Sequence, residues 1–181
     1  SQSHEVDHVR EYDGRLIALE IEWNNKDPFF DRDLENFKRL HAEGAISVGV
    51  IVTRGADLQA GLPDLVRRYA EDKAIHGADD LARIGLTPTP RQREAVARRF
   101  ARGAGKRAFA DIWADNFVAD KYGAATTHWR KLEDRVRRGV GNPCPLLLIG
   151  LPASVVTFGE PPGVVEALIE EGAKDDAPET L

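Results

Sequence analysis

The chain has 181 residues, a mass of 20.0 kDa and a formal net charge of −5 at pH 7. Hydrophobic residues make up 42% and charged residues 30%, a globular composition that excludes a fibrous or disordered chain. The single cysteine, Cys144, excludes an internal disulfide framework and a multi-cysteine zinc site. The longest apolar stretch, residues 145–156, is shorter than the about 20 residues that a membrane span needs. Because the chain starts at Ser1 and contains no Met, we expect a trimmed piece of a longer protein.

The first elements predicted along the chain form a β-hairpin. Residues 4–12 and 15–23 are strand-like runs joined by Asp13-Gly14, a pair that suits a tight turn because both residues tolerate positive φ. Pro28 ends the second run, and residues 29–43 have apolar side chains at helical spacing. Residues 45–53 form a β-branched apolar run typical of a buried strand.

The remaining pattern alternates helices with apolar strands. It predicts helices over 58–70, 90–102, 126–138 (capped by Thr126 or Thr127) and 163–171, an irregular segment over 72–88, a buried strand over 145–151 and a short strand over 155–158. Residues 108–119 give no clear pattern. We therefore expect an α/β fold, with one mixed sheet flanked by helices and the hairpin at its N-terminal end. We expect one domain over 1–172 and a disordered acidic tail over 173–181.

Charge is segregated along the chain, so the acidic total is a poor guide to partners. Residues 91–107 contain seven bases against Glu94, and residues 121–138 contain six bases against Glu133 and Asp134. Two such segments are compatible with a phosphate-binding surface. They are equally compatible with two solvated helix faces.

Acidic residues of the predicted hairpin fall on one face of it. If Tyr12 pairs with Arg15, then Asp7 faces Glu20 and Glu5 faces Glu22, and all four carboxylates project to the same side. Like charges directly opposite each other destabilise a sheet. The other face of the second strand carries Ile17, Leu19, Ile21 and Trp23, which we expect to face the core.

Clustered carboxylates relieve their repulsion by holding a proton or by binding a hard divalent cation. Oxygen ligands without a Cys or His group favour Mg²⁺ or Mn²⁺ over zinc. A bound Mg²⁺ activates water and neutralises charge on a phosphate, which suits phosphodiester hydrolysis. The alternative is a solvated sheet face with scattered acids, because a register slip of one residue would undo the pairing.

Asp7 followed by Glu20-Ile21-Glu22 is a D…E-x-E pattern. It resembles the PD-(D/E)XK nuclease superfamily, in the variant where Glu replaces the usual Lys. Four longer strings resemble the BglII and BamHI group of type II restriction endonucleases: LEIEWNNKDPFFDRDLENF (19–37), ISVGVIVTR (46–54), KYGAATTHWRKL (121–132) and NPCPLLLIGL (142–151). The resemblance covers most of residues 5–151.

The resemblance implies a restriction-endonuclease-like fold and a prokaryotic, cytoplasmic homodimer that cleaves a short palindromic site in double-stranded DNA with Mg²⁺. Asp7 and Glu20 would be the metal ligands, with the carbonyl of Ile21. Glu22 takes the place of the superfamily Lys, where it would orient or deprotonate the attacking water or bind the metal. Lys26 would supply positive charge near the scissile phosphate. Glu5 is close to this group, although the motif does not require it.

Two departures from the family pattern bear on activity. Asp7 follows Val6 rather than Pro, and only six residues precede it. Family members carry helices there that assist dimerisation and DNA contact, so this piece alone is expected to be impaired.

Other polar residues are candidates for DNA contact, each with a structural alternative. Asn24 and Asn25 could read adenine or form a turn before Pro28. The acids of Asp31-Arg32-Asp33 suit a helix N-terminus, while Arg32 could touch phosphate. Residues that follow a buried strand or open a helix are the remaining candidates for phosphate or base contact: Arg54, Thr126, Thr127, His128 and Lys131.

Three other functions fit the same residues. A repair or junction nuclease of the same superfamily would share the acidic motif. A DNA-binding module without catalysis would use only the basic segments. A hydrolase of small phosphate esters would use only the carboxylates and a metal.

Overall fold

The structure is a computed structural model that describes residues 5–102 and 107–159. Its first two strands, β1 (His8–Tyr12) and β2 (Arg15–Glu22), form the predicted antiparallel hairpin, with Tyr12 paired to Arg15 and His8 to Leu19. Asp13 and Gly14 turn the chain with positive φ angles of 51° and 68°. The hairpin and its register are therefore as the Asp-Gly pair predicts, although residues 1–4 lie outside the described part.

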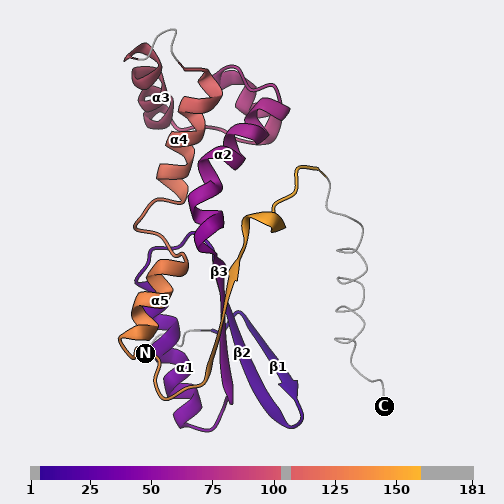
Figure 1. Cartoon of the computed structure of the whole chain (residues 1–181), viewed down its shortest axis with the longest axis vertical. Helices are drawn as coiled ribbons and strands as arrows, with labels where there is room; N and C mark the ends of the chain where they lie inside the picture. Colours follow the sequence, from indigo (N-terminus) through magenta and orange to yellow (C-terminus); the bar gives the residue numbers. More distant parts are fainter. Residues whose placement is uncertain (1–4, 103–106, 160–181) are drawn as a thin grey trace.

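The hairpin continues into a mixed four-stranded sheet in the order β1-β2-β3-β4 (Figure 1). β3 (Val48–Arg54) is parallel to β2, and β4 (Leu146–Leu151) is parallel to β3. Both parallel strands are the apolar runs that the sequence predicts. The expected fold class, an α/β fold with one mixed sheet and an N-terminal hairpin, is confirmed.

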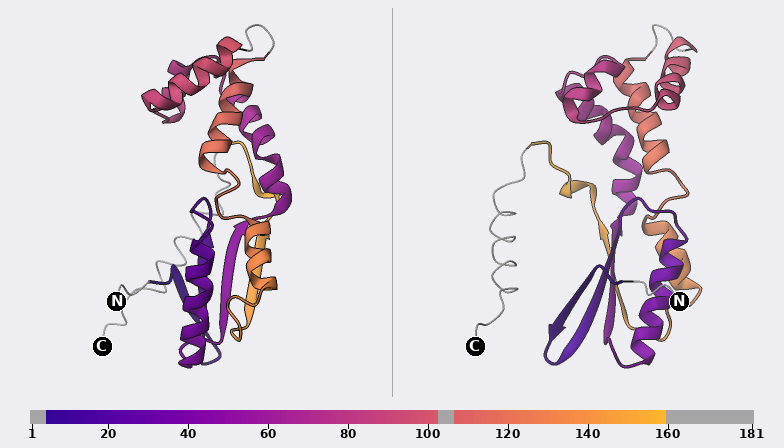
Figure 2. Two further views of the ribbon diagram at one scale, coloured as in Figure 1. Left: turned by 90° about the vertical axis from the view of Figure 1, so that its left-hand side faces the viewer. Right: turned by 180° about the vertical axis from the view of Figure 1, so that it is seen from behind.

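Two helices, α1 (Phe29–Ala42) and α5 (Trp129–Arg137), lie side by side on one face of the sheet (Figures 1 and 2). α1 buries Phe30, Leu34 and Phe37 because they recur at helical spacing. These side chains form the main core with apolar residues of the sheet and of α5, among them Ala18, Ile51 and Leu132. Gly49 lets α1 approach, since a Cβ there would clash with the ring of Phe37.

A helical unit extends from the end of the sheet at which β3 finishes (Figure 1). It consists of α2 (Ala56–Asp72), the 3₁₀ helix η1 (Ala78–Ile84), α3 (Pro90–Arg102) and α4 (Phe109–Lys121). Its own apolar cluster includes Ile75, Leu81, Val96 and Trp113. The molecule is elongated as a result (Figure 2). Among the described residues, no helix combines the length and apolar character needed to cross a membrane.

Several predicted elements need correction. Residues 108–119, which show no clear pattern, belong to α4, and the irregular segment 72–88 contains η1. α5 begins at Trp129 with His128 as its cap, so neither Thr126 nor Thr127 caps it. The predicted strand over 155–158 is wrong, because the chain turns into a short 3₁₀ helix, η2 (Ala153–Val155), after Pro152. The predicted helix over 163–171 and the tail over 173–181 lie outside the described residues.

The sheet faces are also the reverse of one expectation. The covered face of β2 carries Ala18, Glu20 and Glu22, which are 0%, 1% and 2% exposed. The apolar face is less buried: Ile17, Leu19 and Trp23 are half-buried, and Ile21 is 46% exposed. The described helices α1 and α5 lie on the opposite face (Figure 2). The expectation that the Ile21 face forms the core is therefore wrong, and the carboxylates are the residues that α1 buries.

Candidate active site

Asp7 and Glu20 are brought together by the hairpin register. Asp7 precedes β1, and its Oδ2 accepts a hydrogen bond from the backbone N–H of Ile21 at 2.9 Å. The same carboxylate contacts Glu20 through a side-chain hydrogen bond. Asp7 is exposed, whereas Glu20 is buried. The two acids that the motif pairs are thus neighbours at one edge of the buried face.

Burial is the main electrostatic influence on Glu20. Its pKa is raised from 4.5 to about 8, mainly by desolvation, and the nearby negative charges of Asp33 and Asp7 contribute to this rise. At neutral pH and without a cation, Glu20 therefore holds a proton. Since burial and neighbouring acids disfavour the charged form of Glu20, a bound cation would stabilise that form.

Glu22 lies two residues further along β2, in an environment similar to that of Glu20. Burial raises its pKa to about 8, and Asp33 adds to the effect through a hydrogen bond and its charge. Two groups act in the opposite direction: Asn25 Nδ2 donates to Glu22 Oε2 at 3.0 Å, and Arg32 Nη2 lies 3.5 Å from Glu22 Oε1. Glu22 is therefore held between an acid and a base of the α1 segment.

Asp33 is the site residue that the sequence interpretation missed. Its side chain is fully buried on α1, and Arg32 Nε donates to its Oδ1 at 2.8 Å. The interpretation of Asp33 as a helix N-terminal acid ignored its helical position. Asp33 shares the apolar face of α1 with Phe30 and Phe37, and an acid at that spacing is the signal that could have revealed it.

The donor set fits a hard divalent cation rather than zinc. The adjoining carboxylates of Asp7 and Glu20 offer oxygen only, and Glu5 is exposed. Among the residues that the structure describes, no group of three or more His, Cys, Asp or Glu side chains is arranged to hold a metal. Two carboxylates are nevertheless enough for Mg²⁺, which commonly completes its shell with water and substrate phosphate.

The residues after β2 line the outer end of this site. Asn24, Asn25 and Lys26 are exposed. Lys26 forms an isolated antiparallel bridge with Thr126, which places the segment beside the loop that precedes α5. Arg32 contacts the acidic cluster, which consists of Asp7, Glu20, Glu22 and Asp33, and its guanidinium also lies 4.3 Å from the ring centre of Phe29.

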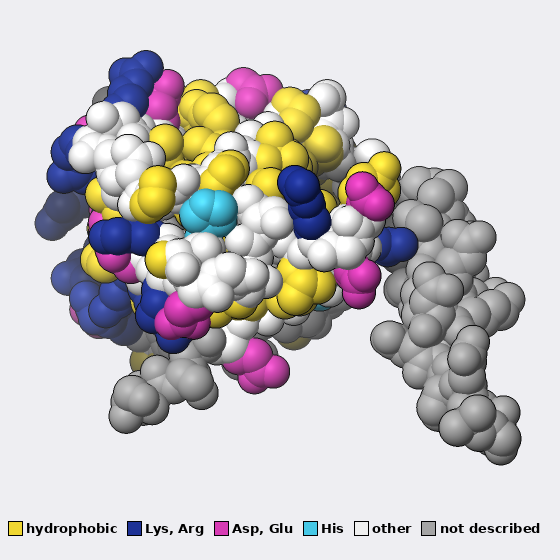
Figure 3. Space-filling model, turned by 90° about the horizontal axis from the view of Figure 1, so that it is seen from below, with side chains coloured by type: hydrophobic (Ala, Val, Ile, Leu, Met, Phe, Trp, Pro, Cys, Tyr) yellow, Lys and Arg dark blue, Asp and Glu magenta, His cyan; other side chains and the backbone are white. Residues whose placement is uncertain are grey.

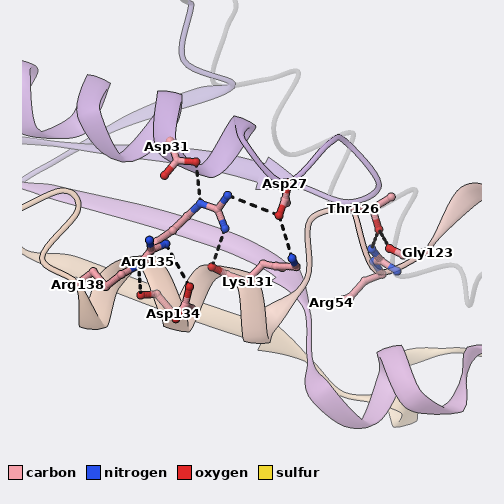
Figure 4. A network of polar contacts seen from close by, with 9 residues as sticks. All are labelled: Asp27, Asp31, Arg54, Gly123, Thr126, Lys131, Asp134, Arg135 and Arg138. Carbon is pink, nitrogen blue, oxygen red and sulfur yellow. Dashed lines mark hydrogen bonds and ion pairs between the residues drawn. The ribbon is translucent and has the colours of Figure 1, made fainter.

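Arg54 is fully buried and engaged on all sides. Its Nε donates to the carbonyl of Trp23 at 2.7 Å, its Nη2 donates to Thr126 Oγ1 at 2.7 Å and to the carbonyl of Thr127, and its Nη1 donates to Gln59. Figure 4 shows Arg54 directed at Thr126, which in turn donates to the carbonyl of Gly123. Burial lowers the pKa of Arg54 to about 10. Any contact of Arg54 with DNA would require breaking these bonds.

The other candidates before and on α5 differ in access. Thr127 is 0% and His128 8% exposed, and burial lowers the pKa of His128, with the charges of Arg54 and Lys131 adding to the effect. Thr126 is half-buried. Lys131 Nζ lies 3.1 Å from Asp27 Oδ2 (Figure 4), so it ties α5 to the segment before α1.

Comparison with known proteins assigns the chain to a family. A family model for the restriction endonuclease BglII/BglIII matches residues 1–151, a range that includes the whole sheet and every residue of the acidic cluster. No curated protein matched the chain, and no solved structure did. The match confirms the resemblance drawn from the Asp7…Glu20-Ile21-Glu22 pattern and the longer strings. The chain belongs to the BglII/BglIII family of restriction endonucleases.

Proposed function

We propose that this chain is the catalytic part of a Mg²⁺-dependent endonuclease that cleaves double-stranded DNA at a specific site as a homodimer. Its family makes it a restriction-type DNA endonuclease. The observation that carries the finer proposal is the contact between Asp7 and Glu20, with Glu22 two residues further along the same buried face. A two-fold enzyme is proposed because palindromic sites call for two-fold proteins.

Each acid has a distinct role in the proposal. Asp7 and Glu20 would hold the cation, with the carbonyl of Ile21. When bound, Mg²⁺ lowers the pKa of a water molecule and neutralises charge that develops on the phosphate. In its ionised form, Glu22 would orient the attacking water and accept its proton. Arg32 holds Glu22 in place through the 3.5 Å ion pair.

The DNA would approach from the end of β2. Asn24, Asn25 and Lys26 are exposed there, next to Thr126. Amide groups can read base edges, and Lys26 offers its charge to the scissile phosphate. Thr127, His128 and Arg54 are buried and would support this surface, with Thr126 and Lys131 at its margin.

Removing the two proposed ligands tests the mechanism. We expect Asp7→Asn and Glu20→Gln each to lower plasmid cleavage in Mg²⁺ by at least about 100-fold, because even outer groups of a metal site are worth about 10- to 100-fold. Both changes keep the shape of the side chain and remove its charge. The measurement is the initial rate of plasmid cleavage.

Glu35→Gln is the matched control, since Glu35 is an exposed acid of α1 that pairs with Lys38. It should leave the rate unchanged. Full cleavage by either ligand variant would remove that residue from the mechanism. Wild-type protein that yields a smear instead of discrete fragments would contradict site specificity.

A further inference from the structure

The two basic segments look alike in sequence, but the structure separates them. In the second segment, four of the bases are ion-paired: Lys131, Arg135, Arg137 and Arg138. Arg135 Nε donates to Asp31 Oδ2 at 2.8 Å and its Nη2 lies 3.6 Å from Asp27 Oδ2. Figure 4 shows these acids and bases facing one another between α5 and the start of α1. The charge of α5 is thus largely used within the fold.

α3 is different, because its arginines are left largely without acids. Arg91, Arg99 and Arg102 make no ion pair with any residue in the described part of the chain. Arg98 has only Glu94, at 3.9 Å, and both side chains are more than 60% exposed. Like charges close together on one helix repel each other and destabilise the helix, and a bound anion would relieve this repulsion.

The arginines of α3 also share one face. Ala95, Arg98, Arg99 and Arg102 follow helical spacing and together line a surface hollow of about 210 Å³. Val96, on an adjoining side of the helix, is buried in the same apolar cluster as Trp113. Since a water molecule takes about 30 Å³ of liquid, the hollow has room for a phosphate group among three guanidinium groups.

α3 is placed where a bound duplex could meet it. It lies at the far end of the helical unit, toward the same side of the long axis as α1 and α5 (Figures 1 and 2). Seen from the hairpin end, most of the visible Lys and Arg side chains gather on that side (Figure 3). The helical unit itself extends from the sheet end beyond which Asn24–Lys26 lie.

We propose that Arg98, Arg99 and Arg102 of α3 form a clamp for the phosphate backbone of the DNA that flanks the cleaved site. This inference rests on the proposed function and adds a second contact region, separate from the acidic cluster. Guanidinium groups suit phosphate oxygens because their donors form a planar fork. Backbone contacts of this kind position the enzyme without reading sequence.

The test compares the salt dependence of binding to duplex DNA of arbitrary sequence, without divalent cation. The variant is Arg98→Gln/Arg99→Gln/Arg102→Gln, which keeps helix propensity. Each lost phosphate contact should reduce the slope of log K against log salt concentration by about 1, so we expect a reduction of about 3 and an affinity at least about tenfold lower at low salt.

The control variant is Arg39→Gln/Arg137→Gln/Arg138→Gln, which removes three exposed bases that already face acids. It should keep the wild-type slope. The conservative variant Arg98→Lys/Arg99→Lys/Arg102→Lys should restore most of it, because counterion release depends on charge. A glutamine variant that binds like the control would overturn the clamp.

A measurement on wild-type protein covers the case in which the glutamine variant does not fold. The salt slope should grow as the duplex is lengthened beyond the cleaved site, because the added phosphates reach α3. A slope that does not change with length would overturn the clamp. Plasmid cleavage by wild-type protein in Mg²⁺ is recorded in parallel, so that loss of the clamp alone is distinguished from failure of the nuclease proposal.

Discussion

Glu20 and Glu22 are two buried carboxylates that face Asp33 across the contact between β2 and α1. Burial raises the pKa of each from 4.5 to about 8. The folded protein therefore binds their protons more tightly than the unfolded chain does. Their contribution to stability is fully present below about pH 4.5 and is lost as pH rises through about 8. In metal-free solution, the fold should weaken over this window.

The variant Glu20→Gln tests this pH dependence. Glutamine cannot ionise, so the free energy of unfolding should fall less steeply between pH 4.5 and 8 than in wild-type protein. Urea unfolding with a chelator at several pH values measures it. Glu35→Gln, at an exposed position of α1, should keep the wild-type slope. A wild-type curve that rises with pH over this window would contradict the burial argument.

The sequence was enough to predict that Asp7 and Glu20 are neighbours, but not which residues surround them. Parity along the hairpin was enough to place Asp7 beside Glu20, because a two-residue turn fixes the register. It could not place Asp33 or Arg32, since contact between a strand and a later helix depends on how α1 packs. The buried state of Arg54 is likewise set by Trp23, Gln59 and Thr126, which lie far apart in sequence.

At the scale of elements, α1 contributes residues both to the hydrophobic core and to the candidate active site. It supplies Phe30 and Phe37 to the core and Arg32 and Asp33 to the carboxylates. Its distance from the sheet depends on Gly49 of β3, where a Cβ would overlap the ring of Phe37. A larger residue at Gly49 would push α1 away from the core and from the carboxylates of β2.

We expect Gly49→Ala to destabilise the protein by about 1–3 kcal/mol, which is the typical cost of overpacking a core. Urea unfolding gives the value. Gly61→Ala is the control, because Gly61 lies within α2 and has open space around it, so that alanine should stabilise by roughly 0.5–1 kcal/mol. Equal stability of the Gly49 variant and wild-type protein would show that α1 can shift at no cost.

Elements were predictable where one periodicity prevailed. α3 and the apolar strands β3 and β4 follow from local pattern, as does α1. α4 did not, because it is surrounded on several sides and buries Ala110, Ile112, Trp113, Ala114 and Val118, which do not form one stripe. The faces of β2 were assigned the wrong way round for a related reason. An apolar face normally marks the core, whereas here carboxylates occupy the covered face of β2.

At the scale of the whole molecule, the described residues form three apolar clusters. One lies between the sheet and α1 and α5, and a second holds together the helical unit that carries the arginines of α3. The third packs Leu58, Leu62 and Val118 of that unit against Trp23 and Leu151 at the end of the sheet. The two basic segments look alike in sequence, and only the structure distinguishes them. Asp27 and Asp31, which are distant from α5 in the sequence, form ion pairs with it. The sequence locates the basic residues, but it does not show which of them form ion pairs within the protein.

The position of Asp7 beside an edge strand has a consequence for how the proposed metal site would lose its cation. β1 is five residues long and exposed throughout, whereas β3 is bonded on both sides. Short edge strands open at a lower free energy than central strands, so amide hydrogens of β1 should exchange with deuterium well before those of β3. If the proposed metal site is correct, Mg²⁺ should slow exchange in β1 selectively, because it would bind only while Asp7 is docked. Uniform protection across the four strands would contradict this. One metal ligand would thus lie beside the strand that opens first. The rate at which the metal is released would then depend on local opening of β1 and not on global unfolding.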